Sequence, residues 1–95
     1  MASSREYLEF ILEQLSGLDG ITFRQMMGEY ILYKDEVIFG GIYDNRFLIK
    51  KTSSTDRLGL KEVIPYPSSK GMYLLDSENP NEIKDIVLDI YNDLR

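Results

Sequence analysis

The sequence predicts a single α+β domain in which an antiparallel sheet is packed by a helix at each end of the chain. Apolar residues recur every three or four positions near both ends, which is the period of an amphipathic helix. Between these ends, β-branched and aromatic runs are separated by short polar breaks, which is typical of an antiparallel meander. A chain of 95 residues has the length of one domain, so residues 1–95 are expected to form one two-layer unit.

The first predicted element is an amphipathic helix over residues 4–16. Ser3 and Glu6 have the spacing of a capping box, and Gly17 is a typical helix stop. The apolar residues that share the helical spacing are Leu8, Ile11, Leu12 and Leu15. The pattern therefore predicts that one face of this helix packs against the sheet.

A meander of strands is predicted over residues 21–51. The first strand ends near Gly28, and its place between two strand-like runs predicts a positive φ or a tight junction. The next runs, with the polar pairs between them, are Glu29–Lys34, Asp35-Glu36, Val37–Tyr43, Asp44-Asn45 and Arg46–Lys51. The first polar pair lacks the glycine typical of a two-residue turn, so a longer loop is an alternative there. Gly40-Gly41 lies inside a run, which predicts a β-bulge or a close backbone approach.

The pattern after residue 51 is weaker until the last helix. Thr52–Asp56 is expected to be a loop or a helix cap, and Arg57–Val63 a short helix interrupted by Gly59. The prolines of Pro65–Gly71 favour an extended loop, and Met72–Leu75 is a candidate for a short strand.

The C-terminal helix is predicted to begin at Pro80, because Asn79 is a typical N-cap and proline suits the first helical position. Its apolar stripe comprises Ile83, Ile86, Val87, Ile90, Tyr91 and Leu94. The period of the stripe matches one buried face, so Ile86 and Ile90 are expected in the core rather than against a partner helix.

Side chains alternate along a strand, so the meander divides into two faces if both polar pairs form two-residue turns. The face expected to pack on the helices comprises Ile31, Tyr33, Ile38, Ile42, Phe47 and Ile49. The candidate interaction face mixes apolar and basic side chains and comprises Tyr30, Leu32, Lys34, Phe39, Tyr43, Arg46, Leu48 and Lys50. Two helices on one side of the sheet leave this second face uncovered.

Three alternatives account for this candidate interaction face. In the first, residues 52–71 cover it within the monomer. In the second, a homodimer or another protein partner buries it, because large exposed apolar patches usually mark partners. In the third, single-stranded nucleic acid stacks on Tyr30, Phe39 and Tyr43, with the basic side chains near its phosphates.

Charge is unevenly distributed along the chain. The net charge is −5, so long-range repulsion is expected to oppose direct binding to DNA. Residues 46–70 nevertheless carry six basic and two acidic side chains, a local net charge of +4. A protein partner is therefore the expected ligand, and a nucleic-acid-associated regulator that uses residues 46–70 is the alternative.

The chain contains no cysteine and no histidine. Thiolate or histidine catalysis and ordinary zinc sites are therefore excluded, and no catalytic, metal or cofactor site is predicted. The first residues lack the pattern of a signal peptide, and no apolar run has the length of a membrane span. These features predict a cytoplasmic, non-enzymatic domain that makes no contact with a membrane.

The segment Phe23–Tyr33 reads Phe-Arg-Gln-Met-Met-Gly-Glu-Tyr-Ile-Leu-Tyr. It resembles the Arg-x-Met-Phe-Gly-Gly-x-Gly-Leu-Tyr signature of the TfoX/Sxy N-terminal domain. The motif positions singled out by this resemblance are Arg24, Met27, Gly28 and Tyr33. Met27 stands where the family usually has phenylalanine, and Glu29 stands where it usually has glycine. The similarity continues through Phe47–Lys50 and Pro65-Tyr66-Pro67 to the C-terminal helix.

This resemblance implies a two-layer fold like that of secretion chaperones. It also implies a link to bacterial competence regulation, in which the full-length relatives act as transcriptional co-activators. The second domain of those relatives has no counterpart in these 95 residues. The function expected from the resemblance is a regulatory or protein-interaction module.

Overall fold

The computed structural model describes residues 3–65, 67 and 69–95, and it confirms the α+β class. Helix α1 spans Arg5–Gln14, the short helix α2 spans Ser53–Asp56, and helix α3 spans Pro80–Leu94. Asn79 caps α3 as predicted, with Pro80 in its first turn. Within the described ranges, no helix combines the length and the apolar character needed to cross a membrane.

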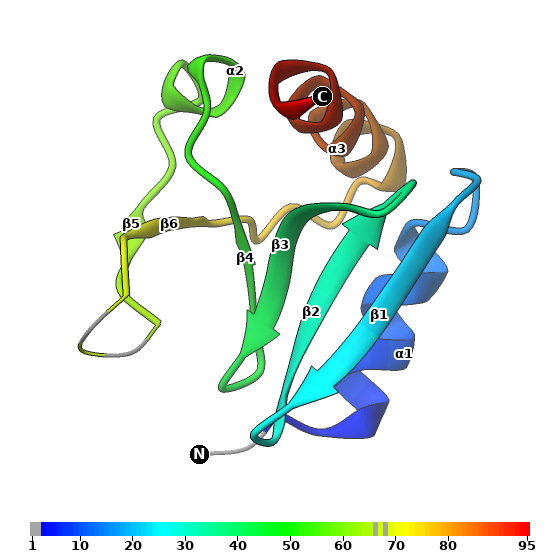
Figure 1. Ribbon diagram of the computed structural model, residues 1–95. Coiled ribbons are helices and arrows are strands. Elements are labelled where there is room, and N and C mark those ends of the chain that lie inside the picture. Colours follow the sequence, from blue (N-terminus) through cyan, green and yellow to red (C-terminus); the bar gives the residue numbers. More distant parts are fainter. Residues whose placement is uncertain (1–2, 66, 68) are drawn as a thin grey trace.

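Six antiparallel strands form one sheet in the order β1-β2-β3-β4-β6-β5. The strands are β1 Ile21–Met26, β2 Glu29–Lys34, β3 Val37–Tyr43, β4 Arg46–Ile49, β5 Glu62–Val63 and β6 Met72–Leu74. Strands β1 to β4 are the predicted meander, whereas β6 follows a long connection before it pairs with β4. Figure 1 shows α1 behind β1 and β2, and none of the three described helices lies on the viewed side of the meander.

Each turn of the meander consists of two residues with positive φ. The pairs are Met27-Gly28 (φ 53° and 82°), Asp35-Glu36 (48° and 70°) and Asp44-Asn45 (53° and 55°). Positive φ at both turn residues gives a backbone twist that matches the twist of the paired strands. The prediction for Gly28 is therefore confirmed, and Asp35-Glu36 closes a two-residue turn although it lacks glycine.

Helix α1 begins at a different cap from the one predicted. Ser4 is the N-cap, and its hydroxyl accepts a hydrogen bond from the Tyr7 amide at 3.1 Å. Ser3 is buried instead, where its hydroxyl donates to Glu29 Oε1 at 2.7 Å and accepts from the Asn45 amide at 3.0 Å. The predicted capping box is wrong because β2 and the β3–β4 turn already engage the first serine.

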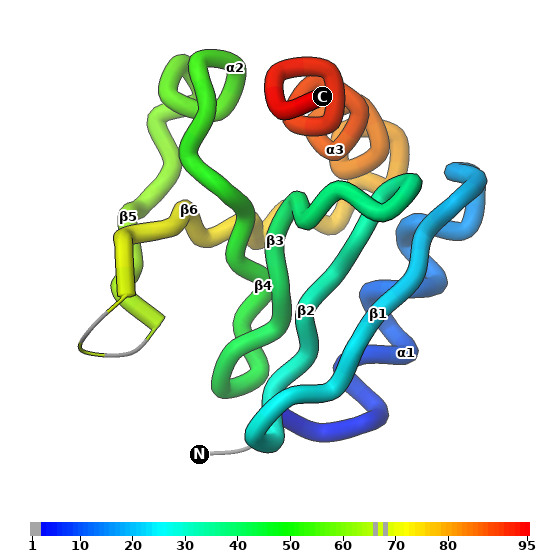
Figure 2. Tube along the Cα trace, viewed as in Figure 1, coloured from blue at the N-terminus to red at the C-terminus, as the bar shows by residue number. Residues whose placement is uncertain are grey.

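The segment after β4 forms α2 where only a loop or a cap was expected. The Thr55 amide donates to Thr52 Oγ1 at 3.3 Å, and the Thr52 amide donates to Thr55 Oγ1 at 2.7 Å. These reciprocal bonds form a capping box that starts the helix early. The helix predicted at Arg57–Val63 is wrong, because Gly59 has a φ of 68° and the chain then enters β5. Figure 2 shows α2 beside the C-terminal end of α3, which it contacts.

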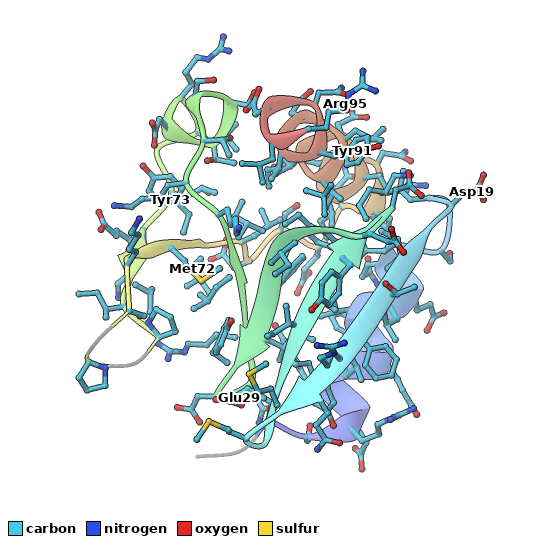
Figure 3. The ribbon with its side chains drawn as sticks, in the orientation of Figure 1. Asp19, Glu29, Met72, Tyr73, Tyr91 and Arg95 are labelled. Carbon is cyan, nitrogen blue, oxygen red and sulfur yellow. The ribbon has the colours of Figure 1, made fainter. Side chains whose placement is uncertain are left out.

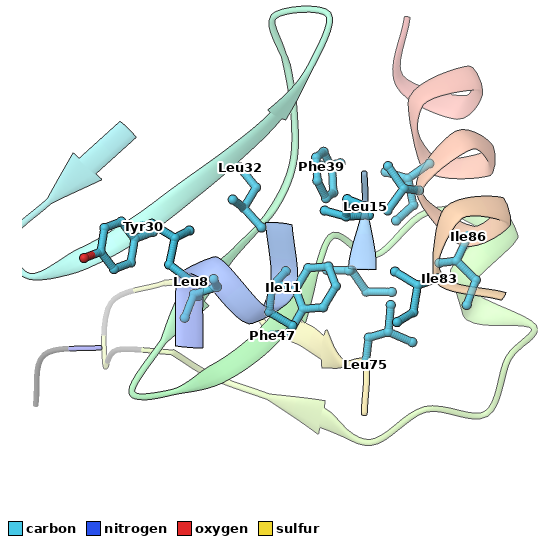
Figure 4. Close-up of a cluster of buried hydrophobic side chains, with 14 residues drawn as sticks. Leu8, Ile11, Leu15, Tyr30, Leu32, Phe39, Phe47, Leu75, Ile83 and Ile86 are labelled. Atoms are coloured by element: carbon cyan, nitrogen blue, oxygen red, sulfur yellow. The ribbon is translucent and has the colours of Figure 1, made fainter. Parts of the chain in front are cut away.

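The core lies between the sheet and helices α1 and α3. Figure 4 shows how residues of both helices and of β2, β3 and β4 meet in one cluster. Its members are Leu8, Ile11, Leu15, Tyr30, Leu32, Phe39, Ile42, Phe47, Ile49, Leu75, Ile83, Ile86, Val87 and Ile90. The predicted burial of Ile86 and Ile90 is confirmed, and Ile83 and Val87 are also core, whereas Leu94 at the end of the predicted stripe is exposed.

A β-bulge in β3 reverses part of the predicted division of the sheet into two faces. Leu32 pairs with Gly40 and Tyr33 pairs with Ile38, so Phe39 has no partner on β2. Because side chains alternate, one extra residue changes which residues of neighbouring strands share a face. The prediction placed Ile31 and Tyr33 of β2 on the same side of the sheet as Phe47 and Ile49 of β4. In the structure, Tyr30, Leu32 and Lys34 lie on that side instead.

The predicted candidate interaction face is consequently wrong for half of its residues. Tyr30, Leu32 and Phe39 belong to the helix-covered core. Lys34 also lies on the helix side, since its Nζ is 5.5 Å from the centroid of the Tyr91 ring of α3. The members that do lie on the side without helices are Tyr43, Arg46, Leu48 and Lys50.

Candidate functional site

The candidate site is the side of the meander that faces the viewer in Figure 1. Along β2, β3 and β4, residues that point to this side lie between residues that point into the core. The apolar residues that point to this side are Ile31, Tyr33, Ile38, Tyr43 and Leu48, and we call this set the helix-free face. Leu48 is fully buried and the other four are half-buried, so apolar surface on this face remains in contact with solvent.

Gly41 makes room for an aromatic ring at the centre of the helix-free face. It pairs with Ile31 on one neighbouring strand and with Leu48 on the other. A Cβ atom at this position would lie 2.7 Å from Cε2 of the Tyr43 ring and 2.6 Å from the Tyr30 carbonyl oxygen. The ring occupies the space of the missing side chain, so the predicted close approach at the paired glycines is confirmed.

Basic side chains border this apolar centre. Arg24 of β1 is in register with Ile31, and Arg46 of β4 is in register with Tyr43, so both lie on the helix-free side. Arg46 Nε donates a hydrogen bond to the Tyr43 carbonyl oxygen at 3.2 Å, which orients its guanidinium. The side without helices therefore combines apolar surface with positive charge, although the whole chain is acidic.

Glu29, at the start of β2, has its carboxylate occupied by hydrogen bonds within the chain. Its Oε1 accepts from the Ser3 amide at 2.9 Å and from the Ser3 hydroxyl at 2.7 Å. Its Oε2 accepts from the Asp44 amide at 3.1 Å. This carboxylate, labelled in Figure 3, thus joins the N-terminal segment to the β3–β4 turn.

An open cleft of 690 Å³ lies where the helix-free face meets the loop before β6. Its basic lining residues are Lys50, Lys51 and Lys70, and we call it the lysine cleft. The other lining residues are Ile38, Gly40, Tyr43, Pro65, Ser69, Gly71 and Met72. Figure 3 shows Met72 and Tyr73 on opposite sides of β6, which places Met72 towards the cleft. The cleft has the mixed apolar and polar lining of a small-ligand site.

The three lysines of the cleft differ in how their charges are compensated. Lys51 forms an ion pair with Glu62 of β5, and its Nζ lies 5.7 Å from the centroid of the Tyr73 ring. Lys50 and Lys70 make no side-chain hydrogen bond or ion pair with any other residue that the structure describes. Among the described residues, no acidic side chain therefore pairs with these two lysines of the cleft.

Two carboxylates outside the cleft stabilise the packing around α2. Tyr73 donates a hydrogen bond to Asp56 Oδ1 at 2.5 Å, and this bond raises the pKa of Tyr73 above its usual value. Asp93 accepts hydrogen bonds from the first turn of α2, including the Ser54 amide at 3.1 Å, which lower the pKa of Asp93. Both contacts are structural, because neither pair lines the cleft.

A second groove and the acidic side chains are weaker candidates. The groove, of 520 Å³, lies between α1 and the edge strand β1, and most of its lining residues are apolar. No group of three or more acidic side chains is placed to hold a metal ion among residues 3–65, 67 and 69–95. The lysine cleft is the stronger candidate because it combines a larger volume with two lysines that have no acidic partner among the described residues.

The residues of the sequence motif do not form a single site. Met27 and Gly28 make the β1–β2 turn, where the Met27 side chain is 95% exposed. Arg24 lies on the edge strand β1, and Tyr33 belongs to the helix-free face. The Pro65-Tyr66-Pro67 part of the resemblance lies partly outside the described residues, since Tyr66 is not among them.

Of the residues that line the cleft, only Tyr43 and Lys50 belong to the candidate interaction face predicted from the sequence. Lys51, Pro65 and Met72 come from a strand end, a loop and a short strand whose pairing depends on the whole fold. Their signal in the sequence was the positive charge of residues 46–70, which identified the region but not the geometry. The structure also separates Arg57 from this group, because it lies at the end of α2 close to Asp93.

No family model matches the chain, so the resemblance to the TfoX/Sxy N-terminal domain stays a prediction. The chain is similar to the "uncharacterized 12.7 kDa protein in trpE 5′ region" of Spirochaeta aurantia, with 33% identity over 78 residues. The match covers 80% of this chain and 68% of the relative. At this identity and coverage, the chain belongs to the same family as the Spirochaeta aurantia protein.

Proposed function

We propose that the protein is a cytoplasmic, non-catalytic regulatory module that binds an acidic segment of a partner protein on its helix-free face. The observation that carries this proposal is the half-buried apolar surface of Ile31, Tyr33, Ile38 and Tyr43, which no helix covers. Contiguous exposed apolar surface bordered by polar groups is typical of protein interaction sites. The resemblance to a domain of competence regulators points to the same class of function.

The charge of the helix-free face selects an acidic partner. Arg24 and Arg46 border the apolar centre, and Lys50 lies at its cleft end. Positive groups around an apolar centre steer and orient a ligand of opposite charge. The partner is therefore expected to present carboxylates around apolar anchor residues.

A symmetric homodimer through this face is a weaker alternative. A two-fold axis would bring the arginines and lysines of one copy close to those of the other, which costs electrostatic free energy. Glu29 is the acidic residue on this side of β2, and its carboxylate is already held by Ser3 and the Asp44 amide. It is thus poorly placed to neutralise the cations of a second copy.

Association with nucleic acid is a second candidate because basic residues and an aromatic ring lie together. Four basic residues of segment 46–70 lie on this side of the sheet or line the lysine cleft, namely Arg46, Lys50, Lys51 and Lys70. Tyr43 lines the same cleft, and aromatic rings bordered by cations suit single strands. The acidic helices oppose this alternative, since they repel phosphates at long range.

The test compares two charge reversals of the same kind on opposite sides of the molecule. Arg46→Glu changes the helix-free face, and Lys84→Glu makes the same change in net charge on α3. Proteins cross-linked in cells to the wild type and to each variant are quantified by mass spectrometry. Circular dichroism and sedimentation of each purified protein show whether it is folded and monomeric.

The proposal predicts that specific proteins are lost with Arg46→Glu and retained with Lys84→Glu, and that these proteins carry acidic segments. Equal recovery with both variants would overturn it. A wild type that sediments as a dimer, and that Arg46→Glu does not dissociate, would also contradict it. Selective loss of nucleic acid rather than protein would establish the second candidate instead.

A further inference from the structure

We propose that the lysine cleft binds a small organic phosphate, a phosphomonoester carried on an apolar or planar body. This proposal goes beyond the protein-interaction role and does not depend on it. It rests on three observations: the volume of the cleft, two lysines without an acidic partner among the described residues, and the apolar side chains of the lining.

The size of the cleft is the first observation. A volume of 690 Å³ lies within the range of about 300–1,000 Å³ that is common for small-molecule sites. One wall comes from β3 and from Lys50 and Lys51 after β4, and the other from Pro65 and residues 69–72. Such a space accommodates a ligand of the size of a nucleotide and exceeds that of a bare inorganic ion.

The second observation is the match between charges. Lys51 is neutralised by Glu62, which leaves Lys50 and Lys70 as two positive charges without an acidic partner in the described chain. A phosphomonoester carries a charge of about −1.5 to −2 at neutral pH, whereas a carboxylate carries a single negative charge. Lysine binds phosphate as a point charge and does not need the planar, two-pronged geometry of an arginine side chain. Two lysines therefore suit a phosphate group.

The third observation is the composition of the remaining wall. Ile38, Pro65 and Met72 contribute apolar side chains to the lining, and Tyr43 contributes an aromatic ring that packs on Gly41. Methionine is flexible and polarisable, so it adapts to a planar ring. The apolar wall has no role in binding a bare ion, so it favours an organic body attached to the phosphate.

The experiment titrates the wild-type protein with adenosine 5′-monophosphate at low ionic strength, followed by calorimetry and amide chemical shifts. Adenosine, inorganic phosphate and a short single-stranded oligonucleotide serve as matched probes. The variants are Lys50→Glu and Lys70→Glu in the cleft. Lys61→Glu is the control, because this exposed lysine belongs to the same basic segment and lies outside the lining.

Each cleft variant is expected to weaken binding of the nucleotide by about tenfold or more, and the control by less than about twofold, because close charges dominate over distant ones. Adenosine and inorganic phosphate are each expected to bind more weakly than the nucleotide. Shift changes are expected at Ile38, Gly71 and Met72.

Four outcomes would overturn the proposal. They are no binding of the nucleotide to a folded wild type, equal affinity for adenosine, an equal loss in the Lys61→Glu control, and tighter binding of the oligonucleotide at the same sites. The last outcome would assign the cleft to phosphodiesters of a nucleic-acid strand. None of these outcomes bears on the partner protein, so the two proposals fail independently.

Discussion

Ile38 and Phe39 are consecutive residues of β3, yet they belong to opposite sides of the sheet. Phe39 is fully buried among core residues under α1 and α3, whereas Ile38 is half-buried on the helix-free face and lines the lysine cleft. The comparison shows that one step along a strand separates the buried core from the partly exposed side of the sheet. The helix-covered side holds the fold, and the other side keeps apolar surface accessible to a ligand.

The two sides also differ in charge. The exposed surfaces of α1 and α3 carry mainly acidic side chains, whereas arginines and lysines border the helix-free face. The exposed acidic residues of the helices are Glu6, Glu9, Glu13, Glu82, Asp85, Asp89 and Asp93. The net charge of −5 therefore conceals a molecule with one negative and one positive side.

The largest expected effect separates the two sides by stability. Phe39→Ala should lower the free energy of unfolding by about 3–5 kcal/mol, because it leaves a cavity in the core. Ile38→Ala, one residue away, should cost about 1 kcal/mol, because its side chain is already partly in water. Urea denaturation of both variants measures the difference. Equal losses would mean that the helix-free face is as firmly packed as the core.

The next effect disturbs the centre of the helix-free face. Gly41→Ala should destabilise by about 1–3 kcal/mol, because the new Cβ would press on the Tyr43 ring and on the Tyr30 carbonyl oxygen. Gly17→Ala is the control, since its Cβ would meet only the flexible end of Lys84. Combining Gly41→Ala with Tyr43→Ala in a double-mutant cycle isolates the part due to the ring. Strict additivity would contradict the packing of the ring on Gly41.

A smaller effect is expected at the Met27-Gly28 turn, which joins the edge strand β1 to β2. Gly28→Val should destabilise by about 1 kcal/mol or more, because a β-branched residue tolerates a φ of 82° poorly. Gly28→Asn is the matched variant, since asparagine adopts positive φ more readily and should lose less. Thermal unfolding distinguishes the two. Identical melting of Gly28→Val and the wild type would show that this turn tolerates a different backbone.

The smallest expected effect is a pH dependence of the free energy of unfolding that arises from Tyr73. The hydrogen bond to Asp56 raises the pKa of Tyr73 above 10.0, so the folded state retains this proton longer than the unfolded state. The resulting stabilisation is present below pH 10 and is lost as the pH rises through the folded-state pKa. Tyr73→Phe should flatten part of this alkaline decline in urea denaturation. Burial also raises the pKa of Tyr7, so a residual decline should remain.

The sequence predicted the elements whose signals are local. The helical stripe from Ile83 to Ile90, the cap at Asn79 and the positive φ of Gly28 follow from residue type and spacing, and the structure confirms them. The division into faces failed because one unpaired residue, Phe39, reverses the alternation. The glycine pair beside it is a signal for a bulge, but it does not say which residue is extra.

The candidate site was less predictable than the fold, since it is built from distant segments. Tyr43, Arg46, Leu48 and Lys50 were placed together correctly because they lie on either side of one two-residue turn. Pairing of β6 with β4 brings Met72 and the preceding loop to the same place, and nothing in the local sequence encodes that register. Tertiary pairing, rather than propensity, therefore decides which lysines line the cleft.

The shortness of β5 and β6 has a consequence for the order in which parts of the molecule form and open. These strands contain two and three residues, whereas the meander is closed by three two-residue turns. Local hairpins form quickly, and a pairing that must close a long loop forms later. We therefore expect the β5–β6 unit to dock last and to detach by local opening while the meander stays intact. A ligand in the lysine cleft would slow this opening, and the amides of residues 62–63 and 72–74 would record it as slower hydrogen exchange.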